Sequence, residues 1–382
     1  MEIYFDNAAT TRIDERVLEF MDQVQREHYG NPSALHRKGL DAEHCVKDAD
    51  RIFTGILKCT ASEIIYTSGG TESNNLALIG GALANRRRGM HIITSSLEHG
   101  SVSMPLKALE DMGFSVTRIG TDGNGVIDLK ALEEAIRNDT IIVSVMAVNN
   151  EIGTIEPLGE IGKIIKKKDP KILFHVDAIQ AFTKFPIIPP ALSIDMMSAS
   201  SHKFYGPKGM GFLYVKKGVR IDPLMLGGGQ QRGMRSGTVN VPGIAAMAMA
   251  AELSMKEMEE RTALYTELRE RIITGIKDIE GVYVNAGSCG TPAILSITAE
   301  DVGAEVLLHA LEDREIYVSS GSACSSHGKK ESATLTSIGL SQKAIKSTVR
   351  LSFGKYNTPE EADRFVEAFR ELVPVLRKYT RK

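Results

Sequence analysis

The chain of 382 residues is 42% hydrophobic and 25% charged, a composition typical of a folded globular protein and not of a disordered one. Its 46 Lys and Arg residues nearly balance 48 Asp and Glu residues, and the net charge of −2 argues against direct binding of nucleic acid or of an anionic membrane. The length exceeds what one hydrophobic core usually serves, so we expect two domains whose partners are small molecules and proteins.

The N-terminal residues 1–7, MEIYFDN, are acidic and polar where a secretion signal would need a basic flank and a long apolar stretch. The longest run of small apolar residues, 244–251, is far shorter than the ~20 residues that span a bilayer. We therefore expect a cytoplasmic protein without a membrane segment. The cysteines, at positions 45, 59, 289 and 324, form no C-x-x-C pair and match no histidine spacing, so neither a metal site nor a disulfide framework is predicted.

Short β-rich runs alternate with amphipathic helical stretches between about residue 63 and residue 215. This alternation is typical of βαβ units and predicts a mostly parallel sheet with helices on both faces. The clearest predicted strands are 64–67, 91–94, 141–145, 172–176 and 211–215.

A glycine-rich loop, 227–237, separates this region from a predicted long helix that runs from about Pro242 towards Ile279. The last helix is predicted to begin at Thr358-Pro359-Glu360-Glu361. Thr358 is the expected N-cap, Pro359 has the first helical position and Glu361 the third. The tail holds fewer strands and reads as a smaller α+β domain. The predicted domains are a large one over 14–253 and a small one built from 1–13 and 254–382.

Polar residues follow several predicted strands. In enzymes built on a parallel sheet with helices on both faces, ligands bind at the carboxyl ends of the strands. Ser68-Gly69-Gly70-Thr71-Glu72 follows the first strand, and its glycines would let backbone amides approach an anion at the start of a helix from about Glu72. The segment indicates a phosphate cup, although a Gly-Gly turn that merely caps a helix is the more common structure.

Asp177 follows the predicted strand 172–176, and Gln180 lies one helical turn further on. A carboxylate at a buried strand end is costly unless it meets a cation, and a protonated pyridine nitrogen is such a cation. Held by Asp177, a pyridoxal ring could accept electrons from a substrate carbanion. The alternative is an Asp that caps the next helix.

Lys203 lies in Ser200-Ser201-His202-Lys203-Phe204-Tyr205-Gly206-Pro207, among hydroxyls, a histidine and a Gly-Pro turn in an otherwise apolar context. Desolvation beside a cationic ring would favour the neutral amine that Schiff-base chemistry needs. We interpret Lys203 as the lysine that binds the cofactor covalently, with Ser200 and His202 on the phosphate, although few lysines in proteins are catalytic.

Eight segments, taken in chain order, carry a resemblance to a known family. They are T-S-G-G-T-E-S-N-N (67–75), E-H (98–99), N-N-E-I-G-T (149–154), H-V-D-A-I-Q (175–180), S-S-H-K-F-Y-G-P-K-G (200–209), R-S-G-T (235–238), S-S-G-S-A-C-S-S (319–326) and R-L-S-F-G-K-Y-N-T (350–358). The set closely resembles the cysteine desulfurases of the NifS/IscS type, which are pyridoxal-phosphate enzymes of the class V aminotransferase fold. The resemblance implies fold type I, a mostly parallel seven-stranded-type sheet covered by helices, with a smaller α+β domain.

The resemblance also implies a role for each matching residue around the cofactor ring. Lys203 would form the Schiff base, Asp177 would hold the pyridine nitrogen and Gln180 the ring hydroxyl. His99 would stack over the ring as an acid and base, with Asn150 near the ring and the substrate. Without the resemblance, His99 reads as an ordinary loop histidine.

The phosphate and the substrate carboxylate have implied partners of their own. The phosphate would be held by Gly70, Thr71, Ser200 and His202. Thr238 would reach it from the neighbouring subunit of a homodimer, because Arg235 to Thr238 show no obvious partner within the chain. Arg350 would bind the substrate carboxylate, for which a planar bidentate donor is well suited, and would otherwise read as a charge on an edge strand.

Cys324 lies in a segment of small residues that cannot pack a core, so its thiolate could reach a substrate sulfur and carry it outward. The resemblance implies that L-cysteine is converted to L-alanine while Cys324 holds the sulfur as a persulfide. The acceptor would be a protein that assembles iron–sulfur clusters or thiolates tRNA. A lone cysteine among serines is idle in most proteins, and only the surrounding constellation makes this one a candidate nucleophile.

Other functions remain open at this stage. A selenocysteine lyase or another class V aminotransferase would share every cofactor residue, and product analysis separates these activities. A non-catalytic platform for partner proteins fits less well with intact Lys203, Asp177, His99 and Cys324. The acceptor stays unidentified, because stretches 286–304 and 329–332 depart from the usual family pattern.

Overall fold

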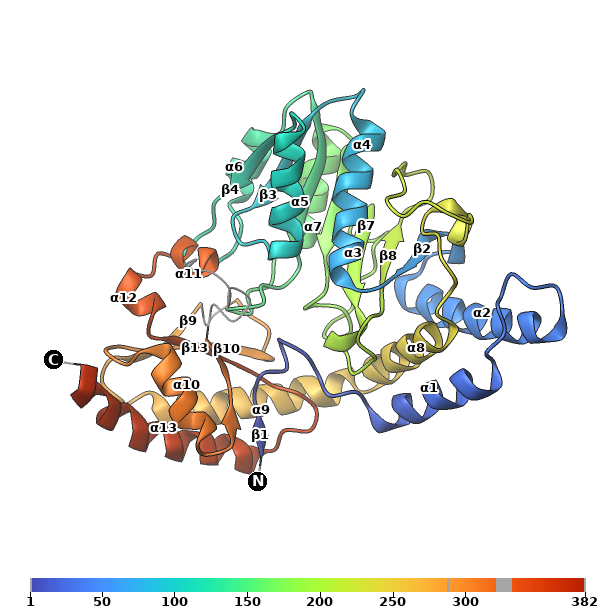
Figure 1. Ribbon diagram of the computed structural model, residues 1–382. Coiled ribbons are helices and arrows are strands. Elements are labelled where there is room, and N and C mark those ends of the chain that lie inside the picture. The colour runs from blue at the N-terminus through green and yellow to red at the C-terminus, as the bar shows by residue number, and fades with distance from the viewer. Residues whose placement is uncertain (1, 287–288, 321–331, 381–382) are drawn as a thin grey trace.

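The computed structural model describes residues 2–286, 289–320 and 332–380 (Figure 1). Cys324 therefore lies outside the described residues. The described chain packs around a large sheet and a smaller one, and no helix in it is long and apolar enough to cross a membrane.

The large sheet has seven strands in the order β2-β8-β7-β6-β5-β3-β4. Their bounds are β2 (Ile64–Thr67), β3 (His91–Ser95), β4 (Ser115–Ile119), β5 (Thr140–Met146), β6 (Leu173–Asp177), β7 (Met196–Ser200) and β8 (Gly211–Val215). The neighbours from β7 to β4 are parallel, whereas β8 pairs antiparallel with both β7 and β2. The predicted fold class, a mostly parallel sheet covered by helices, is confirmed.

The predicted strands match the observed ones to within about a residue at each end. β4 is not among the clearest predicted strands, and its residues explain why. It lies at the edge of the sheet, and of its five residues only Ile119 is buried. A strand that buries so little side-chain surface leaves no strong apolar pattern in the sequence.

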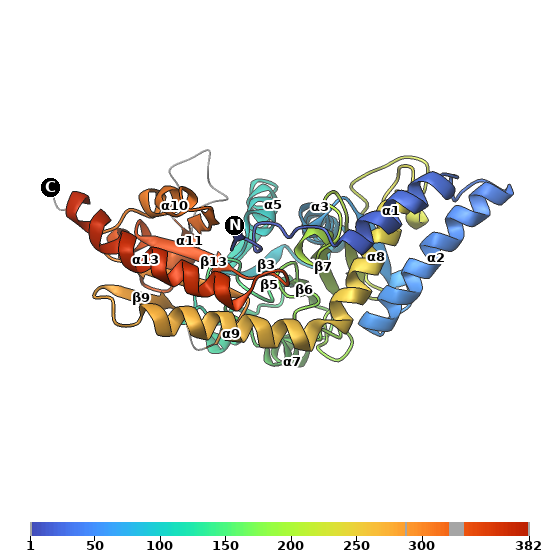
Figure 2. The same cartoon turned by 90° about the horizontal axis from the view of Figure 1, so that it is seen from below.

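Helices cover both faces of the large sheet (Figure 2). One face is covered by α2 (Arg37–Leu57), α7 (Leu158–Lys168) and α8 (Val241–Lys256), whose side chains share one apolar core with the strands. The other face carries α3 (Gly70–Asn75), the π-helical turn Leu76–Gly80, α4 (Gly81–Asn85) and α5 (Gly100–Asp111). The remaining helices of this region are α1 (Glu15–Glu27), which packs on α8, and α6 (Leu129–Ala135), which contacts α7.

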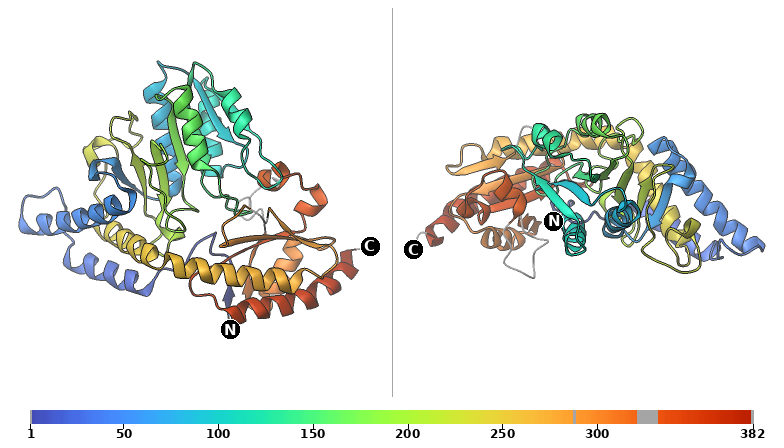
Figure 3. Two further views of the ribbon diagram at one scale, coloured as in Figure 1. Left: turned by 180° about the vertical axis from the view of Figure 1, so that it is seen from behind. Right: turned by 90° about the horizontal axis from the view of Figure 1, so that it is seen from above.

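The small sheet is antiparallel, with strand order β12-β13-β10-β9. Its strands are β9 (Val282–Asn285), β10 (Ile294–Ala299), β12 (Ser319–Ser320) and β13 (Thr348–Ser352). A second apolar core joins it to α9 (Met258–Ile276), α10 (Ala304–Glu312) and α13 (Pro359–Thr380). Figure 3 shows these helices packed beside the small sheet. Two short helices, α11 (Ala333–Ser337) and α12 (Gln342–Ile345), complete this region.

The N-terminal strand β1 (Ile3–Tyr4) pairs in parallel with β11 (Ile316–Tyr317), and Ile3 and Phe5 are buried in the second core. The first residues of the chain thus pack against its last third. The domain limits 14–253 and 1–13 with 254–382 stay a prediction.

The long helix expected from Pro242 towards Ile279 is two helices, α8 and α9, which bend at Glu257 (Figure 2). Glu257 has φ −90° and ψ 6°, outside the helical range, and its carboxylate accepts hydrogen bonds from Arg16 and Lys355. The last helix begins as predicted, because the Thr358 amide donates to Glu361 Oε2 and the Glu361 amide donates to Thr358 Oγ1.

Phe53 of α2 ties this helix to the large sheet. It is fully buried, and its ring centroid lies 4.9 Å from that of Phe212 on β8. We expect Phe53→Ala to lower the free energy of unfolding by about 3–5 kcal/mol, because it removes a large buried side chain and leaves a cavity. Urea denaturation measures this, and Leu35→Ala, at a side chain that is 98% exposed, is the control that should change stability by less than about 0.5 kcal/mol.

Candidate active site

Several predicted site residues meet at one edge of the large sheet. Asp177 ends β6, Ser200 ends β7, His99 follows β3 and Asn150 follows β5. Parallel strands present their carboxyl ends on the same edge, so side chains distant in sequence gather there. Lys203 joins them from a 3-10 turn, Ser201–Lys203, directly after β7.

Asp177 is a buried carboxylate held by two neutral donors. The Ile179 amide donates to its Oδ1 at 3.0 Å, and Asn74 Nδ2 donates to its Oδ2 at 2.8 Å. Burial raises the pKa of Asp177 above its ordinary value, and Ile179, His99, Asn74 and Lys203 offset only part of that effect. A cation bound beside this carboxylate would keep it ionised, which is what a protonated pyridine nitrogen requires.

Lys203 lies against the N-terminal segment of the chain. Its Nζ donates to the carbonyl oxygens of Ala8, at 2.5 Å, and Ala9, at 2.7 Å. Gln180 Nε2 donates to the same Ala8 oxygen at 2.9 Å, and Lys184 Nζ lies 3.3 Å from Gln180 Oε1. These contacts orient the Gln180 amide, which keeps a second Nε2 hydrogen for a ring oxygen.

The turn before α3 has the close packing that an anion cradle needs. Gly69 has φ +148°, and a Cβ placed on Gly70 would lie 2.1 Å from Ile179 Cδ1. A Cβ placed on Gly69 would be 3.7 Å from Ser200 Oγ, so the end of β7 lies beside this turn. A Cβ placed on Gly70 would also lie 3.4 Å from Ser200 Cβ, so the start of α3 lies beside the end of β7. That Gly70, Thr71 and Ser200 share a phosphate stays a prediction.

His202 is held by the same N-terminal segment. Its Nδ1 lies 3.1 Å from Thr10 Oγ1, and its carbonyl oxygen accepts the Thr11 amide at 2.9 Å. Burial, with the nearby charges of Lys203 and Lys208, lowers the pKa of His202 to about 4. A neutral imidazole at physiological pH can still donate one hydrogen bond to a phosphate oxygen.

The expectation that Arg235 to Thr238 lack a partner within the chain is wrong for Arg235. Its Nε donates to Glu72 Oε1 at 2.9 Å, which ties the glycine-rich loop to the start of α3. Thr238 itself is exposed on that loop. Its reach across a homodimer remains a prediction.

Arg350 of β13 faces the loop after β5. Its guanidinium donates to the Asn150 carbonyl at 2.9 Å and to Asp6 Oδ1 at 2.7 Å, and its side chain is only 5% exposed. Among the residues that the structure describes, Nε has no hydrogen-bond partner. A buried, unsatisfied N–H beside the site is suited to receive a substrate carboxylate.

Together these features fit pyridoxal phosphate: a buried carboxylate for the ring nitrogen, an oriented amide for the ring oxygen, a nearby lysine and a glycine cradle for the phosphate. No cluster of three or more His, Cys, Asp or Glu in the described ranges could hold a metal ion.

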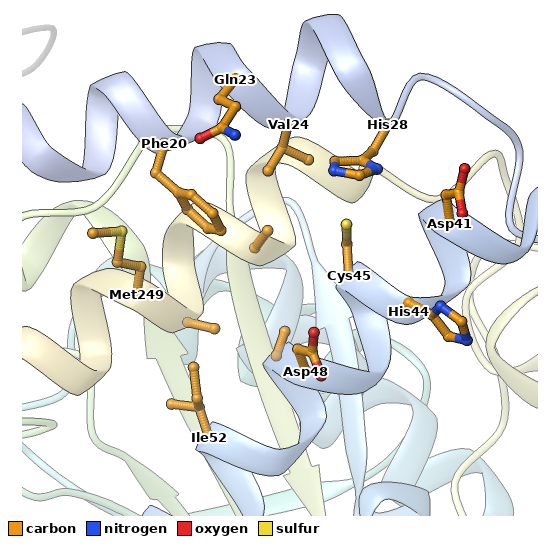
Figure 4. Close-up of a pocket in the computed structure, with 13 residues that line it drawn as sticks. Phe20, Gln23, Val24, His28, Asp41, His44, Cys45, Asp48, Ile52 and Met249 are labelled. Atoms are coloured by element: carbon orange, nitrogen blue, oxygen red, sulfur yellow. The ribbon is translucent and has the colours of Figure 1, made fainter. Parts of the chain in front are cut away.

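A separate hollow of about 420 Å³ lies between α1, α2 and α8 (Figure 4). Phe20, Val24, Ile52 and Met249 supply apolar walls, and Cys45 lies among them. Burial, with a smaller contribution from Asp48, raises the pKa of the Cys45 thiol. None of the predicted site residues lines this hollow.

The site can now be set beside known proteins. Residues 3–365 match the family model for aminotransferase class-V. The chain belongs to this family. It is 43% identical to a protein named cysteine desulfurase IscS from Methanosarcina thermophila over 98% of this chain and 93% of that protein. It is 44% identical to the NifS/IcsS protein homolog of Lactobacillus delbrueckii subsp. bulgaricus, with 97% of each chain covered.

A solved structure agrees with the fold over almost the whole chain. It is described as a NIFS-like protein, is 39% identical, and superposes with a TM-score of 0.93 over 98% of this chain and 100% of that chain. The resemblance drawn from the motifs is thus confirmed at the level of family and fold.

Several residues that contact the predicted site residues were not themselves predicted from the sequence. Asn74 and Ser101 lie inside or beside the family motifs 67–75 and 98–99, but these motifs assign no partner to them, and Asp6 lies in none of the eight segments. Lys184 lies outside all eight family segments. Only its hydrogen bonds to Gln180, which the sequence does not reveal, associate Lys184 with the site.

Glu98, the neighbour of His99, has a carboxyl group buried beneath the site. Its Oε1 accepts from Ser95 Oγ at 2.7 Å and from the Met146 amide at 2.9 Å. Burial raises the pKa of Glu98 to about 8, and the charge of Asp177 acts in the same direction. Glu98 is therefore mostly protonated in the folded protein at neutral pH.

This gives a prediction for stability against pH. The unfolded chain ionises Glu98 near pH 4.5, whereas the folded protein resists ionisation up to about pH 8, so this group's contribution to stability falls as the pH rises between these values. We expect Glu98→Gln to flatten that fall, measured by urea unfolding from pH 5 to pH 8. Glu19→Gln, on the exposed side of α1, should follow the wild-type curve, and a Glu98→Gln curve parallel to wild type would contradict the assignment.

Proposed function

We propose that this protein is a cysteine desulfurase that uses pyridoxal phosphate to convert L-cysteine to L-alanine and holds the sulfur on Cys324 as a persulfide. The observation that carries the proposal is the cluster at the carboxyl ends of the strands, where buried Asp177 lies close enough to His99 and Lys203 for both to influence its ionisation. Relatives at 41–44% identity that are named cysteine desulfurases or NifS homologues support the same reaction.

Each cofactor contact has a candidate residue in this chain. Asp177 would hold the ring nitrogen, Gln180 the ring oxygen, and Lys203 the aldehyde carbon. Gly70, Thr71, Ser200 and His202 would bind the phosphate, together with Thr238 from a second copy of the chain. When bound, the cofactor supplies an electron sink for the negative charge that develops as the substrate Cα loses its proton.

The chain's own residues position the substrate and move its protons. Arg350 would bind the substrate carboxylate, because its buried Nε–H lacks a partner among the described residues while Asp6 and Asn150 hold the rest of the guanidinium in place. Lys203 Nζ would take the Cα proton, and His99, on the same edge of the sheet, would exchange protons above the ring.

Cys324 would complete the sulfur transfer. Its thiolate Sγ attacks the substrate sulfur, the bond between that sulfur and the substrate Cβ breaks, and its electron pair stays with the Cβ carbon. The Cβ carbon then takes up a proton and Lys203 Nζ returns a proton to Cα, so the products are L-alanine and a persulfide on Cys324. The persulfide would pass to a thiol of an acceptor protein, in iron–sulfur cluster assembly or tRNA thiolation.

The first test concerns Lys203. We expect the purified protein to be yellow, and Lys203→Ala to lose covalent cofactor attachment and to slow alanine formation by about a thousandfold or more, because both attachment and Cα proton transfer depend on Nζ. Absorbance and amino-acid analysis measure the two effects. Lys217→Ala, at an exposed lysine after β8, is the control that should keep both. A colourless wild type after reconstitution with excess pyridoxal phosphate would refute the proposed cofactor.

The second test separates cofactor binding from sulfur transfer. We expect Cys324→Ala to bind pyridoxal phosphate normally, because no cofactor contact is altered, while alanine release from L-cysteine falls by about a hundredfold or more through loss of the nucleophile. Cys289→Ala, which removes an exposed thiol outside the proposed site, should retain activity. Alanine production by Cys324→Ala at nearly the wild-type rate would favour a lyase or an aminotransferase on the same fold.

A further inference from the structure

Four polar side chains from three elements form a continuous hydrogen-bonded series at the site. Asn74 of α3 donates from Nδ2 to Asp177 Oδ2 at 2.8 Å and to Ser101 Oγ at 2.9 Å. Ser101, in the first turn of α5, places its Oγ 2.8 Å from His99 Nδ1. The series runs from the carboxylate at the end of β6 to the imidazole at the start of α5, whose helix packs beside α3 (Figure 1).

The two linking residues are enclosed. Asn74 is fully buried and Ser101 is 7% exposed, so water does not compete freely for their hydrogen bonds. A buried hydrogen bond that loses one partner leaves the other unsatisfied, which is costly in a site of low polarizability. The series therefore acts on side-chain orientation more strongly than a surface network of the same length would.

The donors and acceptors can be assigned from the geometry. The Ser101 backbone N–H also donates to His99 Nδ1, at 3.1 Å, so this ring nitrogen must be an acceptor and the ring proton resides on Nε2. Both Nδ2 hydrogens of Asn74 are used, which leaves Ser101 Oγ an acceptor from Asn74 and a donor to Nδ1. Asn74 thus donates to Asp177 on one side and to Ser101 on the other, and Ser101 passes the donation on to His99.

We propose that Asn74 and Ser101 are positioning residues that join His99 to Asp177 and keep His99 in the Nε2–H tautomer. The role given to His99 and Asp177 in catalysis rests on the proposed function, whereas the hydrogen-bonded series does not.

A simple helix cap would explain less of this geometry. His99 is the N-cap of α5, and the cap needs only the bond from the Ser101 amide to Nδ1. The Ser101 hydroxyl adds a second donor to the same nitrogen, and Asn74 links that hydroxyl to the carboxylate. These two additional bonds connect Asp177, the proposed partner of the ring nitrogen, with His99, the proposed acid and base.

The kinetic test uses the holoenzyme with L-cysteine as substrate. We expect Ser101→Ala and Asn74→Ala each to lower kcat by about tenfold with KM within about twofold of wild type, the loss that one buried hydrogen bond would cause. Because either change interrupts the same series, the kcat of the double variant should be no lower than the kcat of the less active single variant. Ser103→Ala, on the same helix but outside the series, should match wild type.

Two kinetic outcomes would overturn the proposal. One is a Ser101→Ala enzyme with wild-type kcat, and the other is a double variant whose loss equals the product of the two single losses. Should Asn74→Ala fail to fold, Ser101→Ala and the spectroscopic test below still decide.

The spectroscopic test reads the tautomer without turnover. In holoenzyme labelled with [15N]histidine, the His99 signals, assigned by their loss in His99→Gln, should show a protonated Nε2 and an unprotonated Nδ1. In Ser101→Ala the Nδ1 resonance should shift, because one of its two donors is removed. A proton on Nδ1 in wild type would refute the series as assigned. A protein that shows the Nε2–H tautomer yet releases no alanine from L-cysteine would instead refute the proposed function alone.

Discussion

A charged carboxylate at the end of a buried strand imposes the strictest requirement in this molecule, because an unpaired charge inside a protein costs several kcal/mol. Asp177 meets that requirement only in part within the chain. The Ile179 amide and Asn74 satisfy its oxygens, but both are neutral, and burial still raises its pKa. A buried acid that stays partly unsatisfied is a common mark of a functional site, since the missing stabilisation can come from a bound ligand.

The N-terminal segment has an unexpected part in this arrangement. Asp6 pairs with Arg350 of the small sheet, and Ala8 accepts from Lys203 and Gln180, which lie after strands β7 and β6 of the large sheet. The Thr11 amide donates to the His202 carbonyl. The first eleven residues thus bridge the segments of the large and the small sheet that meet at the site. Carbonyl oxygens of Ala8 and Ala9 orient the Lys203 ammonium, whereas the Asp6 carboxylate pairs with the Arg350 guanidinium.

Sequence reasoning succeeded where one short segment carries both an element and its chemistry. The strand that ends in Asp177 and the turn that holds Lys203 are each local, so periodicity and turn residues sufficed to place them on a common sheet edge. It failed where a partner lies far away along the chain. Arg235 was expected to lack a partner within the chain, yet Glu72, more than 160 residues earlier, binds it. The break at Glu257 between α8 and α9 was missed for a similar reason, because Glu is a good helix former and its tertiary partners are Arg16 and Lys355.

The amino-acid sequence by itself determined the fold class, the family and the identity of the residues with distinctive chemistry, because strand periodicity, glycine turns and ordered motifs are properties of neighbouring residues. Only the tertiary structure decided how these residues are held. The series from His99 through Ser101 and Asn74 to Asp177 joins three elements, and the pairing of Arg350 with Asp6 spans almost the whole chain. Hydrogen bonds depend on distances of a few tenths of an ångström between side chains. Such distances are set by the packing of helices on the sheet, and no local pattern in the sequence records them.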